Sequence, residues 1–315
     1  MTIDPAVSAD QVLSGFDLTG KRALVTGVSG GIGAETARAL VAHGAHVVGA
    51  ARDLARAEAA THDVRGSASR LELLQLDLAS LASVRAASAQ LRTDRGRFDI
   101  VIANAGIMAV PFGRTADGFE LQLGTNHLGH FAFVNGIASL MNDGARLVTL
   151  STAGHRFSDV DLDDPNFDRT PYDAWTAYGR SKTANILFAV EFDRRYGHRG
   201  VRAVAVHPGA VDTGLSRHLS EEDMADLRER IKNLVPGTGG PPMSVKTAAQ
   251  GAAAPIWAAV VADGADVGGR YCVDFHPAQV ADGVGAHDTV RSYAVDSEHA
   301  QALWARSEEW VGERF

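Results

Sequence analysis

This chain of 315 residues contains one cysteine and lacks the features of a secreted protein. Cys272 cannot form an intramolecular disulfide, which fits a reducing compartment, and we expect it to be a small buried apolar residue. The stretch from Met1 to Asp10 has two acids, no base and no apolar run, so it does not read as a signal peptide. These absences predict a cytoplasmic protein.

Long hydrophobic runs are also missing. The longest apolar stretch, Ala252–Ala262, spans 11 residues and includes Pro255. A helix needs about 20 residues to cross a bilayer. The sequence therefore predicts no membrane partner.

Positive charge is scarce. The chain has 30 Lys and Arg against 38 Asp and Glu, which gives a formal net charge of −8. A protein that binds nucleic acid through its phosphates should have a basic excess or a basic stripe. Nucleic acid is therefore excluded as an expected partner, and a composition of 45% hydrophobic and 22% charged residues fits a soluble globular protein.

Short apolar runs alternate with longer helical stretches along the chain. The runs are apolar on both faces, as in a parallel sheet that helices cover on both sides. Strands are expected at Arg22–Thr26, His46–Ala50, Leu71–Leu76, Asp99–Ala103, Arg146–Leu150, Val201–Val206 and Gly269–Val273. Helices are expected at Ile32–His43, Leu54–Thr61, Leu81–Arg95, Phe119–Met141, Ala174–Tyr196, Leu215–Leu234, Val245–Ala262 and Ala300–Val311. This alternation predicts an α/β, doubly wound (Rossmann) fold with a mostly parallel seven-stranded sheet and helices on both faces.

A single domain is expected. No linker divides the chain, and the one long aperiodic segment, Pro236–Pro242, reads as a loop. We predict an N-terminal extension at 1–17 and one Rossmann-type domain at 18–315.

A glycine-rich turn, Thr26–Gly33, follows the first expected strand and opens the first helix. Such a turn lets the backbone approach a pyrophosphate that rests on the helix N-terminus. Glycines also serve plain turns, but the strand–turn–helix context is the one that phosphate binding requires. The turn residues expected to bind a dinucleotide are Gly27, Ser29, Gly30, Gly31, Ile32 and Gly33.

The glycine spacing, with glycines at 27, 31 and 33, resembles the coenzyme turn of the short-chain dehydrogenase/reductases. Other segments match that family in the same order: Asn104-Ala105-Gly106, Tyr178-x3-Lys182 and Pro208-Gly209-x-Val211-x-Thr213. The segments Asp117–Glu120, Thr125–Phe131 and Ser181–Asn185 are similar to its retinol-dehydrogenase-like branch. The resemblance covers residues 18–311. It implies hydride transfer between a nicotinamide coenzyme and a small carbonyl or alcohol substrate, with a variable substrate lid around 214–244.

The resemblance also implies further coenzyme contacts. These are Asn104, Ala105, Gly106, Tyr178, Lys182, Pro208, Gly209, Val211 and Thr213, with Asp77 and Leu78 near the adenine. From the sequence alone, Asp77 reads equally well as an exposed turn residue.

NADP(H) is favoured over NAD(H) by the end of the second strand. An acid there binds the ribose 2′-hydroxyl of NAD, whereas an arginine accommodates the 2′-phosphate of NADP. Ala51 holds the position of the acid and Arg52 follows it, while Asp53 is expected to cap the next helix. Val28 departs from the pattern, because many NADP-binding relatives have a basic residue there.

The catalytic set implied by the resemblance is Asn126, Thr152, Tyr178 and Lys182. Tyr178 and Lys182 are one helical turn apart, so they share a face. The ammonium group is expected to lower the pKa of the phenol from its usual value of about 10 and so make Tyr178 a proton donor and acceptor. The serine position of the family holds Thr152, with Ser151 just before it, and both hydroxyls remain open as the catalytic one. Asn126 is expected to hold a water through its backbone carbonyl.

Other functions remain open at this stage. A dinucleotide-binding sensor or scaffold could keep the fold without turnover, and epimerisation or double-bond reduction could occur on the same fold. His127, His130 and His207 lack carboxylate or cysteine partners at ligand spacing, so we expect them to pack or hydrogen-bond and predict no metal. The helix that carries Tyr178 is a common subunit contact in the family, which makes a homo-oligomer possible.

Overall fold

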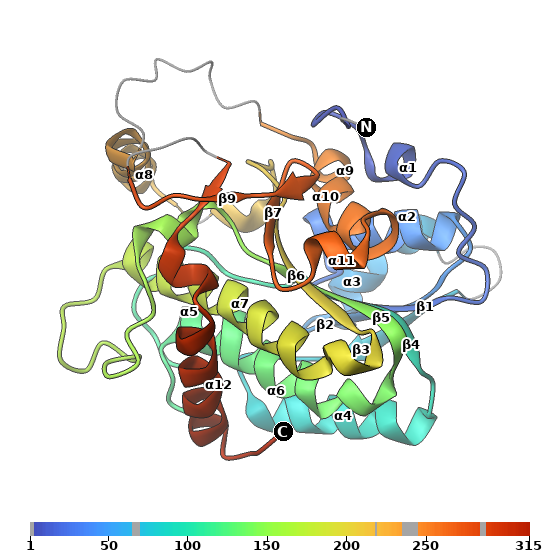
Figure 1. Ribbon diagram of the computed structural model, residues 1–315, viewed down its shortest axis with the longest axis horizontal. Helices are drawn as coiled ribbons and strands as arrows, with labels where there is room; N and C mark the ends of the chain where they lie inside the picture. The colour runs from blue at the N-terminus through green and yellow to red at the C-terminus, as the bar shows by residue number, and fades with distance from the viewer. Residues whose placement is uncertain (1–2, 65–69, 218, 235–244, 284–287) are drawn as a thin grey trace.

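The computed structural model (Figure 1) describes residues 3–64, 70–217, 219–234, 245–283 and 288–315. Within them, the main sheet has the strand order β3-β2-β1-β4-β5-β6-β7-β8. Strands β1 to β7 run parallel, and β8 pairs antiparallel with β7. The bounds are β1 (Arg22–Thr26), β2 (His46–Ala51), β3 (Leu71–Gln75), β4 (Phe98–Ala103), β5 (Met141–Leu150), β6 (Arg202–His207), β7 (Tyr271–Val273) and β8 (His276–Pro277).

The predicted doubly wound fold is confirmed, because all seven expected strands form and pair in parallel. The short antiparallel strand β8 extends the sheet beyond the prediction, since two residues are too few to show a periodicity. A separate parallel pair joins β9 (Gln279–Val280) and β10 (Thr289–Val290).

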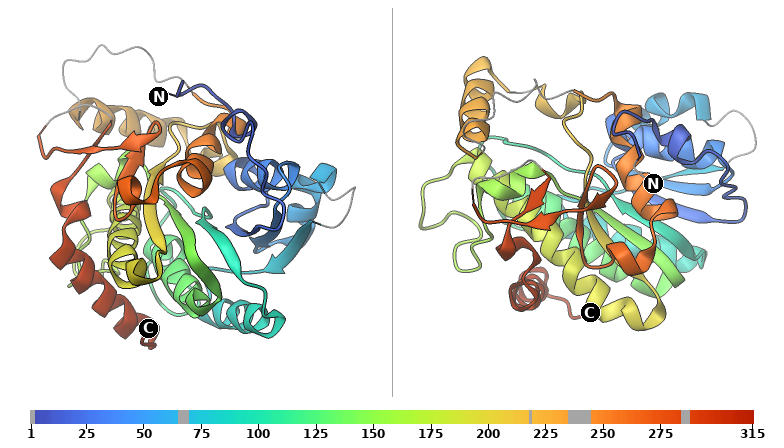
Figure 2. Two further views of the ribbon diagram at one scale, coloured as in Figure 1. Left: turned by 45° about the vertical axis from the view of Figure 1, so that its right-hand side comes forward. Right: turned by 45° about the horizontal axis from the view of Figure 1, so that its top comes forward.

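Helices cover both faces of the sheet, as Figures 1 and 2 show. One layer contains α4 (Leu81–Asp94), α6 (Gly129–Gly136), α7 (Ala174–Tyr196) and α12 (Ser297–Val311). The other contains α1 (Ala9–Val12), α2 (Gly31–Ala42), α3 (Leu54–Ala60), α9 (Ala248–Gly251), α10 (Ala253–Ile256) and α11 (Gly264–Val267). Successive strand residues face opposite layers: Leu24 packs in the first, and its neighbours Ala23 and Val25 pack in the second.

The remaining elements are short turns and the helix of the expected lid. They are α5 (Leu121–Leu123), α8 (Glu221–Leu234), the π-helical turns η2 (Gly124–Leu128) and η7 (Trp257–Val261), and the 3₁₀ turns η1 (His62–Val64), η3 (Ala138–Leu140), η4 (Ala153–Phe157), η5 (Gly197–Arg199), η6 (Gly214–Ser216) and η8 (Ser292–Val295). Of the lid predicted at 214–244, residues 218 and 235–244 lie outside the described residues.

Two segments that were each predicted as one continuous helix are divided into shorter elements. The helix expected at Phe119–Met141 is divided into α5, η2, α6 and η3, and β5 already begins at Met141. Gly129 packs so closely on the Leu78 backbone that a Cβ there would lie 2.3 Å from the Leu78 carbonyl oxygen. The helix expected at Val245–Ala262 is likewise divided into α9, α10 and η7. Pro255 lies within α10, where it lacks the N–H that would continue a regular helix.

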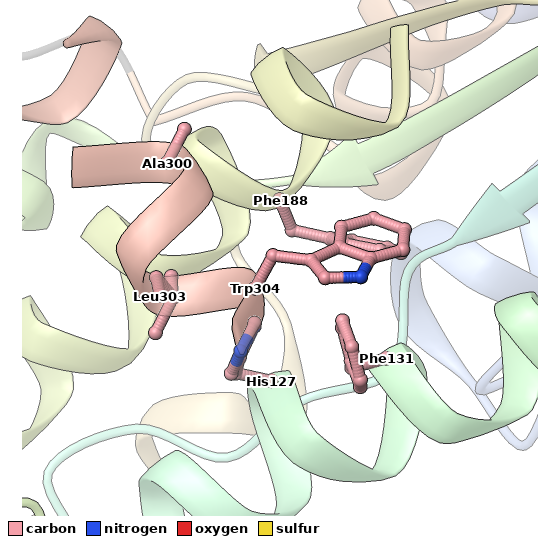
Figure 3. A pocket seen from close by; sticks show the side chains of 6 residues that line it. All are labelled: His127, Phe131, Phe188, Ala300, Leu303 and Trp304. Carbon is pink, nitrogen blue, oxygen red and sulfur yellow. The ribbon is translucent and has the colours of Figure 1, made fainter. Parts of the chain in front are cut away.

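The C-terminal helix α12 covers α7 through an aromatic cluster (Figure 3). The centroid of the Trp304 ring lies 5.0 Å from that of Phe131 and 5.8 Å from that of Phe188, and the three rings line a shallow pocket. Sixteen of the 23 residues of α7 are buried within the chain. Little of the surface of α7 is therefore accessible for the subunit contact that the family resemblance implies.

The N-terminal extension also joins the packed structure. Ser8 caps α1, and Ala9, Leu13 and Leu18 are buried in the layer that contains α2 and α10. Cys272 is buried on β7, as expected. Among the described residues, none of the helices is both long and apolar enough to cross a membrane.

Candidate active site

The predicted site residues meet at one edge of the sheet, where the parallel strands have their carboxyl ends. Ligands of open α/β sheets bind at this edge. The glycine-rich turn follows β1, Asn104–Gly106 follow β4, Ser151 and Thr152 follow β5, and Pro208–Thr213 follow β6. Tyr178 and Lys182 reach the same edge from α7.

Two glycines of the glycine-rich turn, Gly27 and Gly33, are packed too closely for a side chain. Gly27 has φ of 80°, and a Cβ at Gly33 would lie 2.3 Å from the Gly27 carbonyl oxygen. A Cβ at Gly30, the N-cap of α2, would have no atom of another segment within 4 Å. Ser29 and Ile32 are half-buried beside it. The backbone at the positive end of α2 is thus open to a close approach, which fits a pyrophosphate.

The loop after β6 folds back onto this turn. A Cβ at Gly31 would lie 3.2 Å from the Thr213 side chain, so the two segments touch. Val211 pairs with Lys246, while Pro208 is buried and Gly209, at φ of 92°, lies against the Lys246 side chain. The structure thereby brings the two predicted coenzyme segments together.

Arg52 is exposed at the carboxyl end of β2, directly after the buried Ala51. Asp53 caps α3, as predicted, by accepting a hydrogen bond from the Arg56 backbone N–H at 3.0 Å. Val28 is fully buried against Gly49, so it belongs to the interior. The Arg52 guanidinium is therefore accessible to a ligand at the carboxyl end of β2, next to the neutral Ala51.

Asp77 and Leu78 lie after β3 and have structural contacts of their own. The half-buried Asp77 accepts the Ala79 N–H at 3.0 Å through its carboxylate, as a turn residue does. Leu78 places its side chain in the core between the sheet and α6.

Tyr178 is paired with Thr152. The Tyr178 ring and the Thr152 hydroxyl lie next to each other, since a Cβ at Gly154 would lie 2.9 Å from Tyr178 Cε1 and 2.8 Å from Thr152 Oγ1. Thr152 Oγ1 accepts the Gly154 N–H at 2.8 Å. Ser151 is turned away, because its hydroxyl donates to the Lys182 carbonyl oxygen at 2.9 Å and is fully buried. Of the two hydroxyls that the sequence left open, only that of Thr152 meets Tyr178.

Lys182 and Asn126 complete the predicted catalytic set. Lys182 Nζ donates to the Leu150 carbonyl oxygen at 3.2 Å and lies 5.6 Å from the centre of the Tyr178 ring. The Asn126 amide accepts the Ile107 N–H and donates to the Ile107 carbonyl, both at 2.9 Å. A Cβ at Gly106 would lie 3.2 Å from Asn126 Oδ1 and 3.5 Å from Lys182 Nζ, so this glycine lies between the two side chains.

Burial controls the ionisation of the pair. It raises the pKa of Tyr178 to about 12, against a smaller lowering by the neighbouring Thr152 side chain, and it lowers the pKa of Lys182 to about 8. The sequence predicted a lowered pKa for the Tyr178 phenol, and in this geometry that prediction is wrong. The reason is that Lys182 Nζ is bound to the Leu150 carbonyl, while the phenol is enclosed by apolar side chains.

An apolar cluster surrounds Tyr178. It contains Ala109 and Trp175 as buried members, with Met108, Phe157, Ala174, Leu219 and Leu227 packed against it. The last of these residues comes from α8, and Arg230 of the same helix binds the Asp173 carboxylate at 2.8 Å. The described part of the expected lid thus packs over the tyrosine.

Thr26 and His130 were not among the predicted site residues, yet both are hydrogen-bonded to predicted site residues. Thr26 Oγ1 accepts the backbone N–H groups of Asn104 and Ala105, both at 3.0 Å, and lies 2.9 Å from His130 Nε2. The predicted role of His130 as a hydrogen-bonding residue could be read from the sequence, but its partners could not. Among the described residues, no group of three His, Cys, Asp or Glu side chains could hold a metal ion.

The chain belongs to the short-chain dehydrogenase/reductase family. A family model described as enoyl-(acyl carrier protein) reductase matches residues 27–250. A probable oxidoreductase of Streptomyces lividans is 42% identical over 92% of this chain and 97% of its own length. Retinol dehydrogenase 13 of Homo sapiens is 36% identical over 94% of this chain and 86% of its own. The chain is thus an oxidoreductase-family protein with retinol-dehydrogenase-like relatives.

A solved structure supports the same assignment. A short-chain dehydrogenase from Burkholderia cenocepacia J2315, in complex with NADP, has a TM-score of 0.63 to this fold. It is 27% identical, and the match covers 85% of this chain and 99% of that one.

Proposed function

We propose that this protein is an NADP(H)-dependent carbonyl reductase or alcohol dehydrogenase. The observation that carries the proposal is the close arrangement of Tyr178, Thr152 and Lys182 at the edge of the sheet where the glycine-rich turn lies. Membership of the family and an NADP-bound structural relative support the nicotinamide coenzyme. NADPH, when bound, supplies the hydride.

The residues of this chain would position the substrate and move the proton. Because the pKa of Tyr178 is about 12, its hydroxyl is protonated at neutral pH and can donate a proton to the oxygen of a carbonyl substrate. Thr152 uses a lone pair for the Gly154 N–H, so its own hydrogen is available to the same substrate oxygen or to Tyr178. The apolar cluster excludes water from this position. The same Tyr178 oxygen would accept that proton back in the reverse oxidation of an alcohol.

The coenzyme-facing residues would be those of the two packed segments. The backbone at Gly30–Gly33 would hold the pyrophosphate, and the Thr213 loop would close over it. Lys182 and Asn104 would lie near the nicotinamide end, where β1 and β4 meet. Arg52 would bind the 2′-phosphate of NADP, because the neutral Ala51 stands where an acid would repel that phosphate.

The first experiment tests Tyr178 and Lys182 with NADPH and a panel of aldehydes, ketones and one α,β-unsaturated thioester. Tyr178→Phe removes only the ionisable oxygen, so turnover should fall by about 10²–10⁴-fold while NADPH affinity is kept. Lys182→Ala should lower both turnover and NADPH affinity, and the double variant should be little worse than either single one.

Absorbance at the nicotinamide band measures turnover, and fluorescence titration measures NADPH affinity. Near-normal turnover of Tyr178→Phe would contradict the mechanism and favour another reaction on the same fold. NADPH binding by the wild-type protein without turnover on any substrate would favour the sensor alternative.

The second experiment tests the coenzyme preference. NADPH should bind at least about tenfold more tightly than NADH, a difference of about 1.4 kcal/mol. Arg52→Ala should reduce that difference, because it removes the cation beside Ala51, while Arg56→Ala on α3 is the matched control for loss of a nearby charge. Equal affinities of the wild-type protein for the two coenzymes would overturn the assignment of Arg52.

A further inference from the structure

His130 has two hydrogen-bonding partners from different parts of the site. It lies in the first turn of α6 and is 2% exposed. Its Nε2 atom is 2.9 Å from Thr26 Oγ1, at the end of β1, and its Nδ1 atom is 2.9 Å from the Asn126 carbonyl oxygen. The imidazole therefore connects the start of the glycine-rich turn with a predicted catalytic residue.

The partners determine which nitrogen carries the proton. A hydroxyl has one donor and two acceptor sites. Thr26 Oγ1 uses both acceptor sites for the N–H groups of Asn104 and Ala105, so its hydrogen must be donated to His130 Nε2. At the other end the Asn126 carbonyl can only accept, so His130 Nδ1 must carry a hydrogen. Both ends assign the same neutral tautomer, with the proton on Nδ1.

The imidazole remains neutral at physiological pH. Burial lowers the pKa of His130 to about 4, which is the net effect after a smaller raising by the hydrogen bond to the Asn126 carbonyl and a still smaller lowering by Lys182. The ring therefore does not exchange protons during turnover. Its effect must come from the positions of the groups that it holds.

Asn126 lies in a stretch of backbone that a regular helix would not produce. In the π-helical turn η2 the Gly129 N–H donates to the Gly124 carbonyl, five residues earlier. The side chain of His130, four residues after Asn126, reaches back to the Asn126 carbonyl. Such π-turns are frequent at functional sites.

We propose that His130 is a positioning residue, which fixes the Asn126 carbonyl and links it through Thr26 to the coenzyme turn. We call this set, Thr26, His130 and Asn126, the His130 clamp. Its catalytic effect rests on the proposed function. Because Thr26 holds the backbone of Asn104 and Ala105 and the Asn126 amide holds that of Ile107, the segment after β4 is held from both sides. Gly106, which lies beside Lys182 Nζ, is in the middle of that segment.

The direct test is the tautomer of His130 in the wild-type protein. With ¹⁵N-labelled histidine, NMR should show Nδ1 protonated and Nε2 unprotonated from pH 5.5 to 8, with and without NADPH. His130→Asn assigns the resonance. A proton on Nε2, or titration near the ordinary histidine pKa of about 6.5, would overturn the clamp. This measurement does not depend on turnover, so it decides the clamp even if the proposed reaction fails.

Two substitutions test the effect on catalysis. His130→Asn keeps an amide donor near the position of Nδ1, whereas His130→Gln places its amide near the position of Nε2. We expect His130→Gln to lose about tenfold to a hundredfold in kcat, because Asn126 is no longer held, and His130→Asn to lose clearly less. An equal loss of kcat in the two variants, or a larger loss in His130→Asn, would overturn the proposed effect on catalysis.

His127→Gln is the matched control. His127 is equally buried on the same segment, but its Nε2 atom is hydrogen-bonded to Ser307 on α12. This variant should lower the melting temperature and leave kcat within the range of the wild-type protein. If His127→Gln lowers kcat as much as His130→Gln, the effect is one of core packing and the clamp has no special role.

Discussion

At the scale of single residues, the adjacent hydroxyls of Ser151 and Thr152 have different functions because their side chains point to opposite sides of the backbone. Ser151 and Thr152 follow β5 in extended conformation, where successive side chains alternate. Ser151 therefore faces the α7 backbone, and Thr152 faces Tyr178. The hydroxyl of one residue supports the helix, and that of the other is available to a substrate.

Substitution of each hydroxyl should separate these effects. Thr152→Ala should lower kcat severely, by about 10²-fold or more, since it removes a hydrogen bond at the reacting oxygen. Ser151→Ala should chiefly lower stability, by about 1 kcal/mol, because it leaves the Lys182 carbonyl without its hydroxyl partner. Steady-state kinetics and urea unfolding of both variants, with Thr152→Ser as the conservative control, test this. A larger loss of kcat in Ser151→Ala would contradict the assignment.

At the scale of elements, the lid helix α8 is fastened to the helix that carries Tyr178. Arg230 binds the Asp173 carboxylate at 2.8 Å, and Asp173 also caps α7 by accepting the Thr176 N–H at 2.7 Å. Leu219 and Leu227 pack near Trp175, in the cluster around Tyr178. Within the described ranges, this ion pair and a small apolar contact hold α8 over the site.

Loss of that ion pair should weaken substrate binding more than chemistry. Arg230→Ala should raise the KM for the carbonyl substrate by up to about fivefold, because a partly exposed ion pair contributes at most about 1 kcal/mol, and kcat should change little. High salt should raise the KM of the wild-type protein in the same direction. Arg228→Ala removes the same charge from an exposed position of α8 and should leave the KM unchanged. If Arg230→Ala and Arg228→Ala change the KM equally, the ion pair of Arg230 with Asp173 does not hold the lid.

At the scale of the whole molecule, three histidines of the described part of the chain are buried in uncharged form. Burial lowers the pKa of His127 and His155 to about 3 and that of His130 to about 4. In the unfolded chain these groups bind protons below their ordinary pKa of about 6.5. Between pH 6.5 and pH 4 the unfolded state therefore binds more protons than the folded state, and stability must fall as the pH falls.

The expected effect is a steep loss of stability in mild acid. Each histidine contributes up to about 1.4 kcal/mol per pH unit, so the three together lower the free energy of unfolding by up to about 4 kcal/mol per unit. Urea unfolding at pH 7, 6 and 5 measures the slope. His127→Gln should reduce the slope by about a third. A stability that is constant from pH 7 to pH 5 would contradict the burial of neutral histidines.

Much of this structure follows from local sequence patterns. The strand and helix order, the glycine-rich turn and the cap at Asp53 depend on residues that are neighbours in the chain, so periodicity and spacing were enough to predict them. The Tyr178–Lys182 pair could be placed on one face for the same reason. The prediction of one continuous helix missed the π-turn η2, where Gly129 also packs against Leu78, a contact between distant segments that no local pattern contains.

The sequence by itself determined the fold class, the family resemblance and the set of side chains that gather at one edge of the sheet. Only the tertiary structure decided which hydroxyl meets Tyr178, that burial raises the phenol pKa, and that His130 joins Thr26 to Asn126. These features depend on distances between residues up to 104 positions apart in the chain and on how much water each group loses. Neither quantity is a property of a local pattern, because both arise only when the sheet and its two helical layers have packed together.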